Sequence, residues 1–238
     1  MTDTIFINAR LIDPVAQTNT LGALRVRDGL IAEVYEEPKP DVAGMTVNCA
    51  GNCLAPGIVD IGVKVSEPGE RHKESFRSAG RAAAAGGVTT IVTRPDTLPA
   101  IDLPETLEFV SRRAALDAPV RVLPMAALTK GRDGAVMTEI GFLQDAGAVA
   151  FTDCDRVVTN TKVFSRALTY ARSLGALVIA HAQDPGLSEG AAVTSGKFAS
   201  LRGLPGVTPM AERMALDRDI ALLEMTGARY HADQITTA

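Results

Sequence analysis

The chain has 238 residues, and its 24 lysine and arginine residues against 28 aspartate and glutamate residues give a formal net charge of −4. This balance excludes the basic surface of a nucleic-acid-binding protein, and a hydrophobic share of 46% excludes a disordered chain. No apolar run reaches the ~18 residues of a membrane-spanning helix, and residues 1–8 lack the pattern of a secretory signal. Three cysteines without metal-type pairing, Cys49, Cys53 and Cys154, favour a reducing, cytoplasmic compartment.

Residues 1–55 carry short β-type runs separated by turns. An apolar run at 5–7 precedes a polar bend, and runs at 24–26 and 30–34 flank the pair Asp28-Gly29. A strand, an Asp-Gly turn and a returning strand predict a β-hairpin. Because all of these runs are short, we expect residues 1–55 to be a small β-layer domain without a large core.

From residue 56 onward the pattern changes to strand, Gly/Pro turn, helix and strand. Short apolar or β-branched runs predict six strands, at 58–63, 88–93, 120–126, 148–152, 177–181 and 229–232. Periodic apolar residues between them predict five helices, at 73–85, from Asp102, at 137–145, at 163–174 and from near Pro209.

Two of these helices have details that a structure can check. Asp102, with Glu105 three residues later, predicts a capping box at the start of the second helix. The last helix is predicted to have an apolar face formed by Met210, Met214, Ala221 and Met225.

Strands that alternate with helices imply a parallel sheet. An open doubly wound sheet would usually carry a glycine-rich phosphate-binding turn after its first strand, and the sequence has none there. Six βα units of similar length instead indicate a (β/α)8 barrel that is incomplete at its C-terminal end, because a complete barrel takes about 250 residues. We therefore expect an α/β protein with two domains, 1–55 and 56–238.

Several stretches spread along the chain carry a resemblance to a known family. They are 54–69, 81–90, 128–131, 146–151, 184–190 and 219–229, in this order. Together they resemble dihydroorotases, which are members of the amidohydrolase superfamily. The resemblance implies a metal-dependent-hydrolase-type (β/α)8 barrel with a small β-sandwich made from both chain ends. It also implies the reversible cyclisation of carbamoyl aspartate to dihydroorotate in pyrimidine biosynthesis.

The resemblance places metal ligands at the carboxyl ends of the barrel strands. The family's first strand ends in His-x-His, and strand alternation puts positions 62 and 64 on one face. Gly62 and Lys64 stand there, and Gln234 stands where the family has a strand-six histidine. Asp153 matches the bridging aspartate of one dihydroorotase class, and His181 matches the strand-five histidine. A hydrolytic zinc site commonly needs three protein ligands, so we expect no metal cofactor.

The resemblance also places the groups that hold the substrate. The family's arginine for the substrate carboxylate corresponds to Ser66, and its asparagine corresponds to Asp96, which would repel an anion. The catalytic aspartate of strand eight falls beyond Ala238. We therefore expect no catalytic residue in this chain, and we interpret five positions as degenerate: Gly62, Lys64, Ser66, Asp96 and Gln234.

For the remaining candidate residues, a structural role is an alternative to a functional one. His181 can be a buried histidine satisfied by a neighbour, and His231 lies off the ligand position. Cys154 is best explained as a small apolar filler. Lys64 is expected in the barrel mouth, where a buried charge needs a partner, and Asp153 is the expected partner.

Three functions remain open. The first is a non-catalytic subunit, because the losses resemble the inactive homologues that some bacteria pair with aspartate transcarbamoylase. The second is an active dihydroorotase or related cyclic-amide hydrolase with an altered zinc site. The third is a truncated product with no function of its own. We expect the first, with aspartate transcarbamoylase or a second copy as the partner, because the outer strands of an incomplete barrel are open edges.

Overall fold

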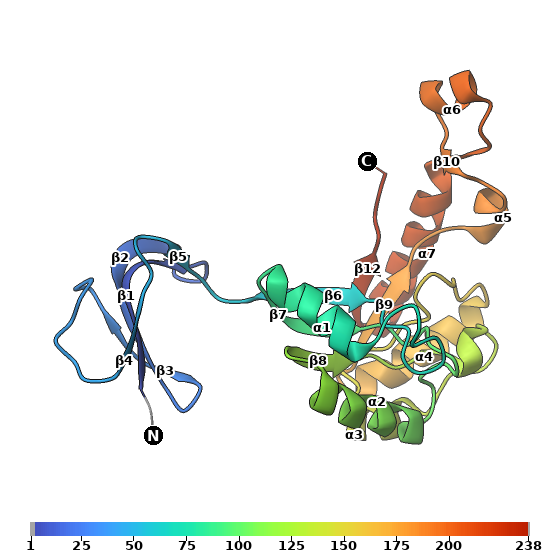
Figure 1. Cartoon of the computed structure of the whole chain (residues 1–238). Coiled ribbons are helices and arrows are strands. Elements are labelled where there is room, and N and C mark those ends of the chain that lie inside the picture. Colours follow the sequence, from blue (N-terminus) through green and yellow to red (C-terminus); the bar gives the residue numbers. More distant parts are fainter. Residues whose placement is uncertain (1–2, 238) are drawn as a thin grey trace. The chain divides into compact units, whose positions relative to one another are not determined.

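The computed structural model describes residues 3–237, and the chain divides into two compact units, Met1–Ile58 and Val59–Ala238 (Figure 1). The first unit is built from strands alone, and the second alternates strands with helices. Among the described residues, no helix is both long enough and apolar enough to cross a membrane.

The first unit is a sheet of five strands: β1 (Thr4–Asp13), β2 (Thr18–Arg27), β3 (Leu30–Tyr35), β4 (Met45–Asn48) and β5 (Cys53–Leu54). β2 pairs antiparallel with β1 and β3, whereas β4 and β5 pair parallel with β1. Between β2 and β3, Asp28 and Gly29 have φ angles of 51° and 79°, the left-handed pair that a tight two-residue hairpin turn requires. The hairpin predicted from these two residues is confirmed.

The two faces of this sheet differ in how well they are covered. One face holds the small core of the unit: Ile5, Ile7, Ala23, Tyr35 and Val42. On the other face, the pairing register places Phe6 beside Leu24 and Val47, and Leu24 beside Val34. Val34 is 63% exposed and Val47 is 39% exposed, so this second face is apolar but largely uncovered.

The second unit contains the strands β6 (Ile58–Val63), β7 (Val88–Thr93), β8 (Arg121–Pro124), β9 (Leu177–His181), β10 (Val193–Thr194), β11 (Gly206–Val207) and β12 (Arg229–Asp233). Its helices are α1 (Phe76–Ala85), α2 (Pro104–Asp117), α3 (Ile140–Asp145), α4 (Thr161–Ser173), α5 (Pro185–Ser188), α6 (Lys197–Arg202) and α7 (Met210–Thr226), with a 3-10 turn at Lys130–Arg132. The strands predicted at 58–63, 88–93 and 177–181 are confirmed with those bounds.

Apart from β10 and β11, which pair with each other in a separate two-stranded sheet, the strands of the second unit lie side by side in the order in which they occur in the chain. β6, β7 and β8 form one sheet, and β9 and β12 form another. Phe151 joins the two sheets through single bridges to Ala126 and Val178. The strand predicted at 148–152 is therefore present only as bridges, although its backbone hydrogen-bonds on both sides. This consecutive order differs from a doubly wound sheet, in which the strand order reverses.

A hydrophobic core fills the space between these strands and the helices. Phe76 of α1, Leu107 of α2 and Phe164 of α4 are each at most 1% exposed. α1 starts at Ser75, whose hydroxyl accepts the backbone N–H of Ser78 in a capping box. The helices thereby cover the strands and leave the carboxyl ends of the strands to the loops.

The capping box predicted for α2 is wrong. The N-cap residue is Leu103, which makes no side-chain capping bond, and Pro104 occupies the first turn. Proline suits this position because its missing N–H would have no partner there. The carboxylate of Asp102 instead accepts the backbone N–H of Gly131, at 2.8 Å.

α7 buries a different face from the apolar one predicted. Met210, Met214 and Met225 are 46%, 51% and 67% exposed. The buried positions are Ala211, Ala215, Asp219 and Leu222. Small alanine side chains allow α7 to pack closely, and the buried Asp219 carboxylate accepts hydrogen bonds from Arg218 and from the hydroxyl of Tyr230. These hydrogen bonds offset the free-energy cost of burying the charged Asp219 side chain.

Candidate functional site

Charged side chains meet at the carboxyl ends of β6 and β7. The ammonium of Lys64 lies 3.0 Å from Oδ2 of Asp96, and Nη2 of Arg94 donates to the same oxygen at 3.1 Å. The side chain of Asp96 is only 4% exposed and that of Arg94 is 16% exposed, whereas Lys64 is 55% exposed. One buried carboxylate thus holds two cations from neighbouring strands.

The same network continues to the next two loops. Nη2 of Arg94 lies 3.5 Å from Oδ1 of Asp155, and Nη2 of Arg132 donates to that oxygen at 2.6 Å. Arg132 is 10% exposed and also donates to the backbone carbonyl of Asp153. We call the five alternating residues Lys64, Asp96, Arg94, Asp155 and Arg132 the charge chain.

Arg94 keeps its charge in this setting. Burial works against the charged form, but the negative charges of Cys154, which ionises only at high pH, and of Asp96 and Asp155 together raise the pKa of Arg94 above its usual value. The nearby thiol of Cys154 is 2% exposed, and burial, with help from Asp96, raises its pKa to about 11. Cys154 is therefore a protonated thiol near neutral pH and does not act as a nucleophile.

The predicted ion pair between Lys64 and Asp153 is wrong. Oδ1 of Asp153 accepts the backbone N–H groups of Leu128 and Thr129, both at 3.0 Å, and its Oδ2 accepts the Thr129 hydroxyl. Burial raises the pKa of Asp153, and these hydrogen bonds oppose the rise. Three hydrogen bonds thus tie the Asp153 carboxylate to the loop after β8, while Lys64 pairs with Asp96 at the end of the adjacent strand instead.

The interior space beside Arg94 is small. Arg94, Gly62, Met125, Thr152 and Ile179 line a cavity of about 30 Å³, together with residues from β12. This volume corresponds to roughly one water molecule. A larger cavity of about 360 Å³ borders the other end of the charge chain, where Arg132, Asp155 and His181 are among the residues that line it.

Gly62 differs from a metal ligand in its backbone as well as its side chain. Its φ angle is +96°, a left-handed value that L-residues with a Cβ rarely adopt, although a Cβ added there would meet no atom within 4 Å. A histidine at this position would be strained despite the open space. The backbone at the first of the two expected ligand positions therefore disfavours a histidine.

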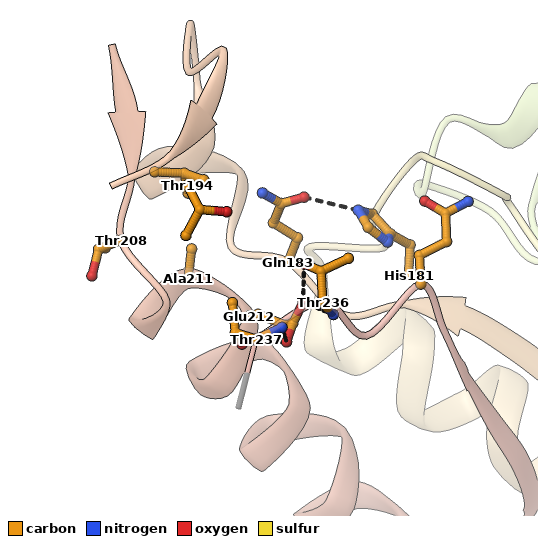
Figure 2. Close-up of a pocket in the computed structure, with 10 residues that line it drawn as sticks. His181, Gln183, Thr194, Thr208, Ala211, Glu212, Thr236 and Thr237 are labelled. Atoms are coloured by element: carbon orange, nitrogen blue, oxygen red, sulfur yellow. Dashed lines mark hydrogen bonds between the residues drawn. The ribbon is translucent and has the colours of Figure 1, made fainter. Parts of the chain in front are cut away.

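His181 lies at the end of β9 and lines a cavity of about 250 Å³, which Figure 2 shows, as well as the cavity of about 360 Å³. Its Nε2 and Oε1 of Gln183 are hydrogen-bonded at 2.8 Å, while its buried Nδ1 has no hydrogen-bond partner among residues 3–237. Gln234 also lines the cavity of about 250 Å³. The carboxylate of Glu212 at its floor accepts hydrogen bonds from the backbone and hydroxyl groups of Thr236 and Thr237.

Ser66 lies away from these cavities, in a segment that has a structural role. It is 7% exposed, and the neighbouring Glu67 is 4% exposed. The Glu67 carboxylate accepts the backbone N–H of Phe76 at 3.1 Å and the Nε–H of Arg113 at 3.0 Å. The segment after β6 is thus anchored to the start of α1 and to α2.

The donor groups brought together here do not fit a three-ligand zinc site. Between residues 3 and 237, no three His, Cys, Asp or Glu side chains lie close enough to share a metal ion. Both oxygens of Asp153 are occupied, Gly62 offers no donor atom, and the ammonium of Lys64 has no lone pair. His181 lines the cavity of about 250 Å³ together with Gln234.

Sequence reasoning missed the central residue of this site. Arg94 and Asp96 flank Pro95 at the end of β7, and only Asp96 was assigned to the site. The available signal was an arginine directly after a buried strand, where an unpaired charge would be costly. Asp155 and Arg132 could not be connected to Arg94 from the sequence, because they come from other loops.

The profile of a family described as dihydro-orotase-like matches residues 51–238. The chain belongs to this family. Among the relatives of this dihydroorotase-like chain, the "Dihydroorotase" of Syntrophobacter fumaroxidans is 37% identical over 98% of the chain and 54% of that protein. A "Dihydroorotase-like protein" of Pseudomonas putida is 39% identical over 98% of the chain and 55% of that protein.

Solved structures support the same fold for the dihydroorotase-like chain. The L-hydantoinase (dihydropyrimidinase) of Arthrobacter aurescens superposes with a TM-score of 0.79 and 21% identity, over 97% of this chain and 52% of that one. A D-hydantoinase superposes with a TM-score of 0.74, again at 21% identity. The dihydroorotase-like chain thus spans about half the length of the proteins it matches.

Proposed function

We propose that this chain is a non-catalytic dihydroorotase-like protein of pyrimidine biosynthesis, which serves as a structural partner of aspartate transcarbamoylase. The observation that carries the proposal is the charge chain at the carboxyl ends of the strands. Lys64 and Arg94 share the buried Asp96 there, and the cavity left beside Arg94 is about 30 Å³. The cavity of about 360 Å³ beside Arg132 and Asp155 has more room, but no three His, Cys, Asp or Glu side chains among residues 3–237 lie close enough to hold the metal that would activate a water molecule.

The proposal includes the architecture of the chain. We infer two domains, 1–55 and 56–238, of which the first is part of a small β-sandwich and the second is a (β/α)8 barrel represented by six βα units. The consecutive strand order supports this reading. The uncovered apolar sheet face of the first unit supports it as well. The compartment inferred from the three cysteines is the cytoplasm.

The partner proposal rests on the edge strands of the second unit. β6 pairs only with β7, and β12 pairs only with β9, among residues 3–237. Ile58, Val59 and Ile61 of β6 are 55%, 55% and 56% exposed. A strand edge with exposed apolar side chains is usually covered, and aspartate transcarbamoylase, a second copy of the chain or further residues of the same protein would each cover it.

One observation favours the alternative, an active dihydroorotase or cyclic-amide hydrolase with zinc in an altered site. Nδ1 of His181 is buried and has no hydrogen-bond partner in the described part of the chain, and His181 shares a cavity of about 250 Å³ with Gln234. A metal or a polar substrate group could complete that hydrogen bond. Besides amides and hydroxyls, the cavity offers only one further zinc-type ligand, the carboxylate of Glu212, which already accepts hydrogen bonds from Thr236 and Thr237.

An activity assay with added zinc separates the two functions. The purified protein is given carbamoyl aspartate and, in the reverse direction, dihydroorotate, with zinc present in excess. The proposal predicts no turnover above the buffer rate. Zinc-dependent turnover that is lost in His181→Ala and retained in the control His231→Ala would establish the alternative instead.

A further inference from the structure

The charge chain connects parts of the molecule that are far apart in the sequence. Lys64 follows β6, Arg94 and Asp96 follow β7, Arg132 lies in the loop after β8, and Asp155 follows the bridge at 151. Four consecutive loops at the carboxyl ends of the strands are therefore linked by contacts of 2.6–3.5 Å. Few ion pairs on a protein surface join so many separate segments.

The middle of the charge chain is buried, which distinguishes it from a surface ion pair. Side-chain exposure is 4% for Asp96, 10% for Arg132 and 16% for Arg94. Two members face solvent: Lys64 at one end is 55% exposed, and Asp155, between Arg94 and Arg132, is 66% exposed. Exposed pairs contribute little to stability, but removing one member of a buried pair leaves an uncompensated charge.

Arg94 occupies the central place in this arrangement. Its guanidinium reaches two carboxylates on different loops, and it also lines the small cavity bordered by Gly62, Thr152 and Ile179. A planar guanidinium has five donors in a fixed geometry, so it can bind several acceptors at once. A bound cation at the end of a barrel holds loops together in the same way, through ligands from several strands.

We propose that Arg94, held between Asp96 and Asp155, is a built-in structural cation that fastens the four loops at the carboxyl ends of the strands. Lys64 and Arg132 lie at the two ends of the charge chain and hold the two carboxylates, Asp96 and Asp155, that contact Arg94. This inference goes beyond the proposed function, because it states what keeps this edge ordered rather than what the chain assembles with. It would hold for an isolated chain or for a subunit of a complex.

Hydrogen exchange on the purified protein tests this inference. Arg94→Gln should speed exchange about tenfold or more in all four loops, 64–69, 94–99, 128–134 and 153–157, because losing a buried charge partner opens the segments it joined. Arg132→Gln should affect the same four loops. Faster exchange confined to 94–99, or none, would overturn the proposal.

Two further comparisons test the same proposal even if Arg94→Gln does not fold. Asp155→Asn removes a link at an exposed position, so it should fold even if Arg94→Gln does not, and it should loosen 128–134 and 94–99 together. Lys64→Met and Lys73→Met form a matched pair, because these lysines are 55% and 57% exposed but only Lys64 contacts a buried carboxylate.

In the matched pair, only Lys64→Met should lower Tm, by about 5 °C. Equal effects of the two substitutions would contradict a special role for the charge chain. Added zinc should leave exchange in the four loops of the native protein unchanged. Slower exchange with zinc would show that a metal, and not Arg94, fastens this edge.

Discussion

The carboxylate of Asp153 shows how one residue can keep its position in a family pattern while making different contacts. Its place at the end of the fourth strand could be predicted from the sequence, as could the losses at Gly62 and Lys64. Its partners could not, because the backbone N–H groups of Leu128 and Thr129 belong to a loop whose course depends on the whole fold. The type of each residue can be read directly from the sequence, whereas its hydrogen-bond partners depend on the tertiary structure.

Substituting Asp153 tests its structural role. Asp153→Ala leaves two buried backbone N–H groups without acceptors, so we expect a loss of about 1–3 kcal/mol of unfolding free energy for each group. Urea denaturation measures this loss. The control is Asp133→Ala, whose exposed carboxylate accepts one N–H from Ala135 at 2.9 Å, and which should change stability far less. Equal losses in both variants would refute the role given to Asp153.

The reactivity of the cysteines gives a second test at this scale. Cys53 is exposed, whereas Cys154 is 2% exposed with a pKa raised to about 11 by burial. At pH 8 a thiol reagent should modify Cys53 within minutes and Cys154 only after the protein is unfolded, because the thiolate is the reactive form. Mass spectrometry of peptides from the native protein follows both sites. If both cysteines were modified at similar rates, Cys154 would not be shielded from the reagent by Arg94 and its neighbours.

At the scale of elements, the strands were easier to predict than the helix faces. β6, β7 and β9 are short apolar runs between turn residues, and their predicted bounds are confirmed. α7 has apolar residues around most of its circumference, so periodicity alone did not identify the buried side. The buried side of α7 is instead determined by the close packing of its small alanines and by Asp219, whose carboxylate accepts a hydrogen bond from Tyr230. The cap of α2 was missed because Pro104 starts the helix without any side-chain bond.

The contact between α7 and the segment after β12 should depend on pH. Burial tends to raise the pKa of Glu212, but hydrogen bonds from Thr237 and Thr236 outweigh it and lower the pKa to about 2. A depressed carboxyl pKa adds stability that is present above the unfolded value of about 4.5 and is lost as the pH falls through about 2. Amide exchange at Thr236 and Thr237 should therefore be slow at pH 5 and faster below pH 2.5, after correction for intrinsic rates.

The variant Glu212→Gln isolates this effect. Glutamine offers one acceptor oxygen where the carboxylate offers two, so exchange at Thr236 and Thr237 should already be fast at pH 5. The difference between native protein and variant should disappear near pH 2. A difference that persists unchanged at pH 2 would contradict the assignment of this contact to the ionised carboxylate.

At the scale of the whole molecule, the fold could be predicted further than the site. The alternation of strands and helices gave the α/β class, and the resemblance gave the family, which the comparisons confirm. The charge chain escaped prediction because it depends on which loops become neighbours. That neighbourhood follows from the strand order, which the sequence pattern alone does not specify.

The open strand edges bear on the association of the chain. With Ile58, Val59 and Ile61 of β6 more than half exposed, the 238-residue chain should not remain a stable monomer in solution. Analytical ultracentrifugation should find self-association, or a defined complex when aspartate transcarbamoylase is added. A well-behaved monomer with a sharp, cooperative melt would mean that these edges are already satisfied.

We propose that the side-chain cations of Lys64 and Arg94, and not a metal ion, occupy the carboxyl ends of the strands in this dihydroorotase-like chain. The most direct measurement is the zinc content of the native protein after equilibrium dialysis against micromolar zinc, determined by elemental analysis. The account predicts well below one zinc per chain, and no change in Lys64→Met or Asp96→Asn, because neither variant restores a ligand set. One tightly bound zinc per chain in the native protein, reduced by His181→Ala or Asp153→Ala, would contradict it.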